Sequence, residues 1–447
     1  MTTSPSRQQA FWALQAVHRG AFTDVAIDQA LKQSDLSSSD RALMTELVYG
    51  SVRRQRTLDA LIDQLGKKSA DQQPPELRVI LHLGLYQLRY LDQIPASAAV
   101  NTSVELAKQQ HLGKLAGVVN GLLRQYIRQA EAGDPLRLPA NAVQQLGVLH
   151  SFPDWILKVW QPLLPLEELA ELCDWFNRPP FIDLRINPLR TSLEAVEAAF
   201  QTANIELYRL PRLPQTLRLA SHVGSIRRLP GYEEGWWTVQ DASAQLVSQI
   251  VNPQPGEVII DACAAPGGKS THLAELMGDR GQIWACDRAA SRLKKVQENI
   301  NRLQLSSIQL LAGDSRSLPQ FAQTADRVLL DVPCSGLGTL HRHADARWRQ
   351  SPQRINELVQ LQSQLVNQAA TWIKPGGLLV YSTCTLHPLE NEAVIQKFLA
   401  THPQWQLEVP EQSEIRAIAA AEGWVKIWPH REDMDGFFVA KLRSTSA

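Results

Sequence analysis

The sequence has no long hydrophobic run and little cysteine. No apolar stretch in its 447 residues approaches the roughly 18 that a membrane-spanning helix needs, and the first residues show neither a hydrophobic segment nor a cleavage site. We therefore expect a cytoplasmic protein with no membrane partner. The five cysteines are odd in number, lie far apart and form no CxxC pair: Cys173, Cys263, Cys286, Cys334 and Cys384. This pattern favours reduced thiols and supports neither a disulfide framework nor a metal site.

The chain also lacks an excess of charge of either sign. Its 45 Lys and Arg residues balance 45 Asp and Glu residues, and the two kinds are interspersed with no basic tail. A nucleic acid would therefore be bound through local basic patches and shape rather than through a strong overall field. The length predicts about three domains with sizeable cores.

Three regions of different periodicity follow one another. From Arg7 to about Arg128 apolar residues recur at three- and four-residue spacing, which predicts an all-helical domain over 1–135, with Ser39 or Asp40 and also Ser97 as candidate N-caps. Residues 150–240 mix short strands with a helix and predict a small α+β domain. From 241 to 447, strands and helices alternate, which predicts a doubly wound, mostly parallel sheet closed by an antiparallel C-terminal strand.

Ligands of such sheets bind at the carboxyl ends of the strands. The first predicted strand end, DACAAPGGKS at 261–270, has two glycines that let the backbone approach a ligand and a helix start with free N–H groups. It matches neither the G-x-x-x-x-G-K-[ST] nor the G-x-G-x-x-G motif, which disfavours phosphate and dinucleotide ligands. Lys269 either orients this loop or is a solvent-exposed lysine at the helix start.

Acidic residues follow the next two strands. Asp287 is placed to accept hydrogen bonds from ribose hydroxyls, and Asp314 to accept one from an adenine amino group. Each acid alone is more often a cap or a turn residue. Together with the glycine loop they predict an adenosine pocket.

Cysteines mark the fourth and fifth strand ends. Asp331 and Cys334 lie in DVPCSG, and Cys384 lies in STCT. In the expected strand order 3-2-1-4-5 these strands are neighbours about 4.8 Å apart, so the two thiols should face one cleft beside the adenosine pocket. Packing readily explains a lone buried cysteine, but not two at adjacent strand ends beside a carboxylate.

These motifs carry a family resemblance. DACAAPGGKS, DVPCSGLGTL and STCTLHPLENE resemble the motifs of the S-adenosylmethionine-dependent RNA cytosine-C5 methyltransferases of the Nop2/Sun group, whose Pro-Cys and Thr-Cys motifs match Pro333-Cys334 and Thr383-Cys384. The helical first third resembles the NusB-like RNA-binding fold, and the likeness to bacterial 16S ribosomal RNA methyltransferases of this group covers nearly the whole chain.

The resemblance implies a domain plan and ligands. It implies a NusB-like RNA-binding domain at 1–135, a small α+β RNA-binding subdomain at 150–240, and a Rossmann-like methyltransferase domain with a seven-stranded, mostly parallel sheet at 241–447. The implied cofactor is S-adenosyl-L-methionine, the partner is 16S ribosomal RNA, and a monomer is expected. The residues expected to hold the cofactor are Cys263, Ala264, Ala265, Pro266, Gly267, Gly268, Lys269, Asp287, Asp314 and Asp331.

By the same resemblance Cys384 is the nucleophile that adds to cytosine C6, Cys334 assists product release, and Asp331 contacts N3 and the exocyclic amine. The reverse assignment of the two cysteines is chemically possible, and spacing does not choose between them. The Thr-Cys motif favours Cys384 by analogy.

Basic residues outside these motifs are candidate RNA contacts. His341-Arg342-His343 and Arg347-Trp348-Arg349 follow the Pro-Cys motif. The densest basic cluster of the helical region is Arg53-Arg54-Gln55-Arg56, for which a solvated helix end is the alternative interpretation.

Two other functions compete with this one. An exocyclic-amine methyltransferase would carry an Asn/Asp-Pro-Pro-aromatic motif, and the run that begins at Asp331 lacks the second proline and the aromatic residue. A non-catalytic RNA-binding or antitermination-like protein is the second alternative, against which the intact Cys334, Cys384 and Asp331 argue. A transfer RNA substrate stays open, since no residue identifies the target cytosine.

Overall fold

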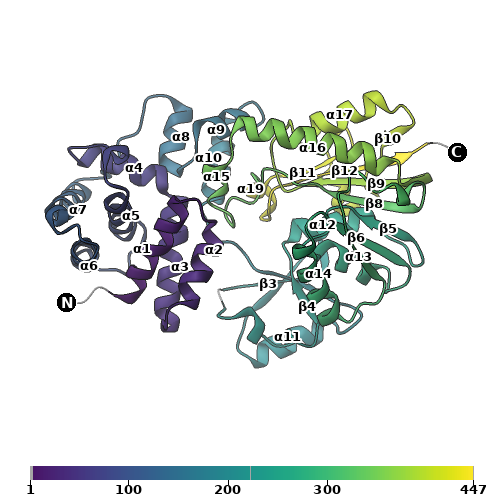
Figure 1. Ribbon diagram of the computed structural model, residues 1–447, viewed down its shortest axis with the longest axis horizontal. Helices are drawn as coiled ribbons and strands as arrows, with labels where there is room; N and C mark the ends of the chain where they lie inside the picture. Colours follow the sequence, from purple (N-terminus) through teal and green to yellow (C-terminus); the bar gives the residue numbers. More distant parts are fainter. Residues whose placement is uncertain (1–3, 222, 446–447) are drawn as a thin grey trace. The chain divides into compact units, whose positions relative to one another are not determined.

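The computed structural model describes residues 4–221 and 223–445, which form two compact units (Figure 1). The helical unit comprises the chain up to Arg178 together with Leu340–Arg349, and the sheet unit comprises Pro179–Thr339 and the chain from Gln350 onward. A ten-residue segment that follows the Pro-Cys motif is thus part of the helical unit. The division into three domains stays a prediction.

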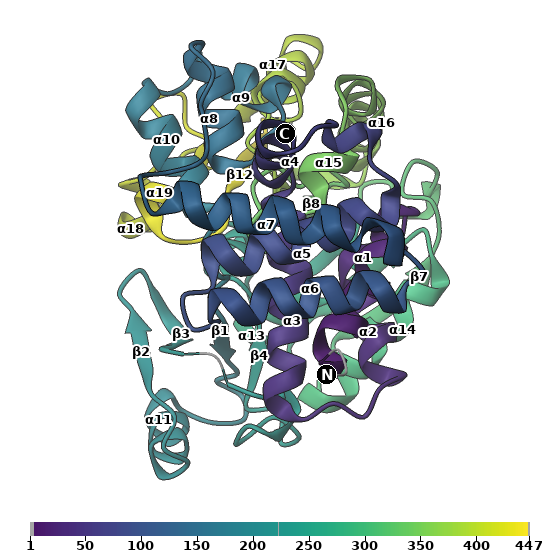
Figure 2. The ribbon, with the colours of Figure 1, turned by 90° about the vertical axis from the view of Figure 1, so that its left-hand side faces the viewer.

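The helical unit contains the helices that the first third of the sequence predicts and four further ones, two of which, at 154–160 and 166–175, lie in the range 150–240 predicted for the small α+β domain. In its described residues they are α1 (Pro5–His18), α2 (Thr23–Lys32), α3 (Ser38–Arg53), α4 (Gln55–Leu65), α5 (Pro75–Tyr90), α6 (Ala96–Gln109), α7 (Ala116–Ala130), α8 (Ala142–His150), α9 (Asp154–Trp160), α10 (Leu166–Trp175) and the short α15 (Ala346–Arg349). Helices α5, α6 and α7 pack side by side (Figure 2). Their apolar faces enclose one core around Phe11, Leu47 and Leu123, because each helix repeats apolar residues on one face.

Two predicted helix caps are wrong. Helix α3 is capped by Ser37, whose hydroxyl accepts a hydrogen bond from the backbone N–H of Asp40 at 3.1 Å, so the helix starts earlier than the apolar pattern indicated. Helix α6 is preceded by Pro95, and the predicted cap Ser97 lies inside the helix. Apolar periodicity begins only where a helix meets its core, which need not be its first turn.

A small antiparallel sheet begins the sheet unit. Its strands β1 (Asp183–Ile186), β2 (Leu207–Leu210), β3 (Leu213–Leu219) and β4 (Trp237–Val239) lie in the order β2-β3-β1-β4. Helix α11 (Leu193–Thr202) packs on it through Val196 and Phe200. The predicted α+β character of this region is confirmed.

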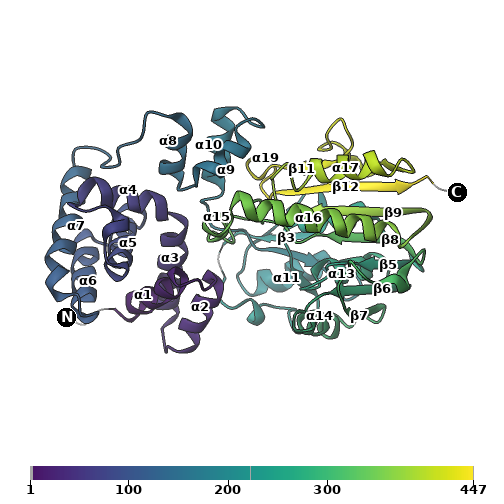
Figure 3. The same ribbon diagram turned by 45° about the horizontal axis from the view of Figure 1, so that its top comes forward.

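The main sheet has the predicted doubly wound order. Its strands are β5 (Val258–Asp261), β6 (Gln282–Asp287), β7 (Ile308–Ala312), β8 (Ala325–Asp331), β9 (Ile373–Thr383), β10 (Trp405–Leu407), β11 (Val425–Ile427) and β12 (Phe437–Ser444). Strands β7, β6, β5, β8 and β9 are parallel neighbours, which is the order 3-2-1-4-5, and β12 is antiparallel to β9 (Figure 3). Among the described residues the sheet has eight strands; seven form its main path, and the short β11 pairs with β12 beside that path.

Helices cover both faces of this sheet. Side chains alternate along each strand, so Ile259 packs with α12 (Ala242–Val251), α13 (Gly268–Leu276) and α14 (Ala290–Leu303), whereas Ile260 packs with α16 (Pro352–Ala370) and α17 (Glu392–Thr401). The remaining helices of the unit, α18 (Ser413–Arg416) and α19 (Pro429–Glu432), are short. The carboxyl ends of the parallel strands meet the N-terminus of α13 at one edge.

A search of the described helices for one long and apolar enough to cross a membrane finds none.

Candidate active site

The parallel strands end level with one another. Asp331 at the end of β8 is in register with Ser382 near the end of β9, and Asp287 at the end of β6 is in register with Ala312 at the end of β7. This edge therefore gathers the predicted site residues, as the strand order requires.

The two cysteines that follow β8 and β9 meet at this edge. The Sγ atoms of Cys334 and Cys384 lie 3.3 Å apart, and both residues are half-buried. The hydrogen bond with Cys384 raises the pKa of the Cys334 thiol, and burial raises it further. The prediction that the two thiols converge is confirmed, whereas their chemical roles stay predictions.

Lys269 points at Asp331. Its Nζ atom donates to Oδ2 of Asp331 at 2.7 Å, and Oδ1 of the same carboxylate accepts from the hydroxyl of Ser382 at 2.8 Å. Burial acts to lower the pKa of Lys269, but the Asp331 carboxylate outweighs this effect and raises it. The lysine side chain is only 13% exposed, so the solvent-exposed interpretation is wrong.

The loop after β5 is held by a buried acid and one obligatory glycine. Ser270 donates to Asp261 at 2.6 Å, and burial raises the pKa of Asp261 to about 7. Gly267 has a φ of +99°, and a Cβ atom there would lie 2.9 Å from Cγ1 of Val296. At Gly268 a Cβ atom would find an ordinary 3.5 Å contact with Gln240, so the backbone requires glycine at the first position of the pair and not at the second.

The two acids of the predicted adenosine pocket differ in their surroundings. Asp287 is 5% exposed, accepts from the backbone N–H of Ala289 at 2.9 Å and lies 3.1 Å from Arg292. Asp314 is more exposed, and hydrogen bonds from Arg316 lower its pKa to about 2. Both side chains offer acceptor oxygens, which suits the hydroxyl and amine donors of an adenosine.

These groups form a set of hydrogen-bond donors and acceptors that fits S-adenosyl-L-methionine. The N-terminus of α13 offers backbone N–H groups to a carboxylate, while Asp287 and Asp314 offer acceptors to the ribose and the base. Half-buried Cys263 and buried Ala264 and Ala265 belong to the same loop. The assignment of individual contacts stays a prediction.

Arg185 on β1 supports the glycine loop and is not among the predicted site residues. Its guanidinium donates to the two carboxylate oxygens of Glu275 on α13, at 2.8 and 2.7 Å, and to the carbonyl oxygen of Gly268 at 2.6 Å. Both charged side chains are 0% exposed. The pair fastens the small sheet to the helix that starts at the glycine loop; a basic residue within the apolar strand DLRI is the sequence signal that pointed to it.

Several predicted RNA contacts face the interior of the helical unit. Arg347 is 0% exposed and donates to backbone carbonyls of Ser151, Phe176 and Leu340, with its guanidinium carbon 4.1 Å from the centre of the Phe152 ring. The prediction that Arg347 contacts RNA is therefore wrong.

Other predicted RNA contacts are also engaged within the helical unit. His341 is 2% and Arg53 is 6% exposed, and Arg53 donates to the carbonyl of His341 at 3.0 Å. Arg56 pairs with Asp154, and the indole N–H of Trp348 donates to the carbonyl of Val52. These groups hold segments of the helical unit together, so the basic cluster is structural in large part. Arg54, Arg342, His343 and Arg349 are partly or fully exposed and stay predicted RNA contacts.

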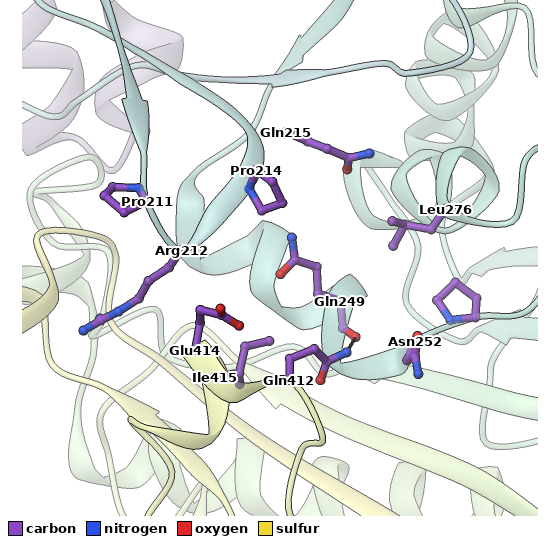
Figure 4. Close-up of a pocket in the computed structure, with 11 residues that line it drawn as sticks. Pro211, Arg212, Pro214, Gln215, Gln249, Asn252, Leu276, Gln412, Glu414 and Ile415 are labelled. Atoms are coloured by element: carbon purple, nitrogen blue, oxygen red, sulfur yellow. Dashed lines mark hydrogen bonds between the residues drawn. The ribbon is translucent and has the colours of Figure 1, made fainter. Parts of the chain in front are cut away.

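A separate pocket of about 500 Å³ lies at the far end of α13 (Figure 4). Gln215, Gln249 and Gln412 contribute amides to its wall, and Leu276, the last residue of α13, lines it. Helix α13 has 9 residues and is therefore about 13 Å long, which separates this pocket from the glycine loop at its other end. None of the predicted site residues lines it.

Three ranges of the chain match known protein families. Residues 4–128 match the NusB family, residues 152–225 match the ferredoxin-like domain of RsmF/B-type methyltransferases, and residues 248–443 match the family described as 16S rRNA methyltransferase RsmB/F. Fold and matches together define a methyltransferase with a NusB-type helical region and a Rossmann-like sheet.

Relatives extend the match over the full chain. The probable ribosomal RNA small subunit methyltransferase B of Synechocystis sp. is 52% identical over 98% of this chain and 99% of its own, and the methyltransferase B of Vibrio vulnificus is 35% identical over 96% of each. The chain belongs to the RsmB/F family of 16S rRNA methyltransferases.

Solved structures agree in fold. PH0851 is 28% identical and superposes with a TM-score of 0.82 over 99% of each chain. NSun6 from Pyrococcus horikoshii, solved with SFG, has a TM-score of 0.61 at 24% identity over 67% of this chain and 100% of its own. The latter likeness concerns the fold alone.

Proposed function

We propose that the protein transfers a methyl group from S-adenosyl-L-methionine to C5 of one cytosine in 16S ribosomal RNA, through a covalent bond between Cys384 and C6. The observation that carries the proposal is the pair of thiols 3.3 Å apart beside the Lys269–Asp331 ion pair. An enzyme that methylates an exocyclic amine has no use for two adjacent thiols.

Cytosine C5 is too poor a nucleophile to take a methyl group directly. Addition of a thiolate to C6 turns the ring into an enamine with electron density at C5, so a cysteine nucleophile is the necessary first step. The bound cofactor supplies an electrophilic methyl group on a sulfonium. The residues of this chain then have to align C5 with that group, hold a proton for N3, and remove the proton from C5.

Electrostatics favour Cys384 as the nucleophile. The Lys269 ammonium interacts with Cys384, whereas the hydrogen bond with Cys384, burial and the carboxylate of Glu390 together raise the pKa of the Cys334 thiol. A cation stabilises a thiolate and an anion disfavours one. We therefore take Cys384 as the attacking sulfur and Cys334 as the sulfur that removes the C5 proton.

Asp331 and Lys269 act on the polar edge of the base. Asp331 accepts a hydrogen bond from the exocyclic amine, and the proton shared within the ion pair is available to N3 while C6 is attacked. Cys334, after passing its own proton to solvent, takes the C5 proton as a thiolate. The electrons of the C5–H bond restore the C5–C6 double bond, Cys384 leaves as a thiolate, and N3 returns its proton to the ion pair. This sequence returns both cysteines to their starting states after exchange of one proton with solvent.

The flanking regions at 1–135 and 150–240 would select the target. The base has to be splayed out of its stack to reach C6, so contacts outside the site must hold the neighbouring nucleotides. Half-buried Arg54 and Arg342 and exposed Arg349 are the basic groups that we propose for this role in the helical unit.

Bisulfite sequencing of ribosomal RNA from a strain that lacks the gene tests the proposal. One cytosine of 16S RNA should lose its protection from conversion and regain it when the purified protein and labelled cofactor are added. If the label enters transfer RNA and not 16S RNA, the substrate is a transfer RNA. If the label is found on the exocyclic amine, the proposed mechanism is rejected.

A further inference from the structure

A buried carboxylate on the loop before α17 joins the backbone next to Cys334. Glu390 is 0% exposed and accepts hydrogen bonds from the backbone N–H of Ser335 at 2.9 Å and from the hydroxyl of Ser335. Burial raises the pKa of Glu390, and its hydrogen bonds offset this effect only in part. Among the described residues no basic side chain pairs with this carboxylate. Ser335 follows Cys334 directly, so Glu390 fixes the peptide on that side of the thiol.

Gln362 on α16 extends this contact to the other side of Cys334. Its Nε2 atom donates to Oε1 of Glu390 and to the carbonyl of Pro333, both at 3.0 Å. Pro333 precedes Cys334 in the chain. The peptide that carries the first thiol is therefore held on both sides by one connected network.

Asn391, which follows Glu390 in the chain, holds the peptide on both sides of Cys384. Asn391 accepts from the hydroxyl of Thr383 at 2.6 Å and donates to the carbonyl of Thr385 at 2.9 Å. These threonines flank Cys384. The two halves are linked directly as well, because the hydroxyls of Ser335 and Thr385 lie 2.8 Å apart.

We propose that Glu390 and Asn391 are positioning residues that set the separation of the Cys334 and Cys384 thiols. The proposal rests on the proposed function, in which both thiols act on one cytosine. Neither residue touches a reacting atom, but each side chain holds one cysteine loop, and the contact between the hydroxyls of Ser335 and Thr385 joins the two loops. Misplacement by about 1 Å is enough to cost on the order of a hundredfold in rate.

The separation of the thiols can be measured without any reaction on RNA. Phenylarsine oxide loses its oxygen as water when it bonds two thiols at once, and intact mass spectrometry follows the product. Cys334→Ala and Cys384→Ala identify the mass increment that belongs to this pair. The tested variants are Glu390→Gln, which keeps the size of the side chain and removes its charge, and Asn391→Leu, which removes both hydrogen bonds.

A matched control lies two residues away from Glu390. Glu392 is on α17 and pairs with Lys426 at 2.8 Å, so Glu392→Gln removes a carboxylate of the same segment outside the network. We expect Glu390→Gln and Asn391→Leu to slow arsenical capture and to lower single-turnover methylation by about ten- to a hundredfold, with an unchanged KM for the cofactor. Glu392→Gln should change neither.

The outcomes separate the inference from the function on which it rests. Capture at the wild-type rate in both Glu390→Gln and Asn391→Leu would overturn the inference. A wild-type protein that captures the arsenical but does not methylate RNA would reject the reaction and leave the positioning role supported by slowed capture in the variants. If Glu390→Gln does not fold, Gln362→Met tests the same network, and it should slow capture to a smaller extent.

Discussion

Lys269 and Asp331 form a 2.7 Å ion pair that joins the glycine loop after β5 to the end of β8, three residues before Cys334. The pair places a proton between the expected positions of the cofactor and the base. The second carboxylate oxygen of Asp331 accepts a hydrogen bond from the hydroxyl of Ser382, and the two contacts together fix the plane of the carboxylate. The side chains of Lys269 and Asp331 are only 13% and 27% exposed, so this is not a surface ion pair.

Replacement of Lys269 tests this role. Lys269→Met should lower single-turnover methylation by about 10²- to 10⁴-fold, the usual contribution of general acid catalysis, because N3 loses its proton source as C6 is attacked. Lys269→Arg keeps the charge and should retain more activity than Lys269→Met. Equal rates in the two variants would show that proton supply is not the function of this residue.

Cys384→Ser should abolish turnover. A serine hydroxyl is a far weaker nucleophile than a thiolate at neutral pH. The measurement is incorporation of labelled methyl groups into 16S RNA, with Cys173→Ser, a buried cysteine of the helical unit, as the matched control. Near-normal activity in Cys384→Ser would transfer the nucleophilic role to Cys334.

Cys334→Ala should trap the covalent intermediate. Without this sulfur the C5 proton is not removed, so Cys384 cannot leave and the RNA stays attached. The adduct is a band that survives denaturing gel electrophoresis, and Cys286→Ala should show none because that buried cysteine lies apart from the pair. Absence of the band together with normal turnover would remove Cys334 from the release step.

Much of the fold was predictable because its signals are local. Apolar alternation and helical periodicity identified β5 to β9 and the helices between them, and the order 3-2-1-4-5 expected of a doubly wound sheet is the one observed. Residues at strand ends follow from that order, which is why the meeting of Cys334 and Cys384 could be predicted without side-chain coordinates. The eighth strand β11 has three residues, too few for a periodic pattern.

What could not be predicted depends on contacts between distant segments. Arg347 looked like a surface cation, yet its acceptors are carbonyls at Ser151 and Phe176, far away in the sequence. Arg185 and Glu275 are 90 positions apart, and the position of Arg185 within a strand gives no indication that Glu275 is its partner. A charged residue in an amphipathic segment carries no sequence signal of the partner that neutralises it.

Removal of Arg185 should unfold the sheet unit more readily than removal of the whole ion pair. Arg185→Met leaves Glu275 buried without its partner, which costs about 3–5 kcal/mol of unfolding free energy, whereas Arg185→Met with Glu275→Leu should lie close to the wild type. Denaturant unfolding measures both variants. The double variant should also bind S-adenosylhomocysteine more weakly than the wild type, because the carbonyl of Gly268 loses its donor; unchanged affinity would limit the pair to a role in stability.

Asp261 should make stability depend on pH in the direction opposite to that of a salt-bridged acid. Burial raises its pKa to about 7 from 3.8, so between about pH 4 and pH 7 the folded state holds a proton that the unfolded state has lost. The unfolding free energy therefore falls as pH rises through this window, by at most about 1.4 kcal/mol per pH unit for a single group. Asp261→Asn keeps an oxygen acceptor for the hydroxyl of Ser270 and should remove this contribution. The difference between wild type and variant, measured by urea unfolding from pH 4 to pH 8, should change steadily up to pH 7 and then level off; two parallel curves would mean that the carboxylate is already ionised in the folded protein at pH 4.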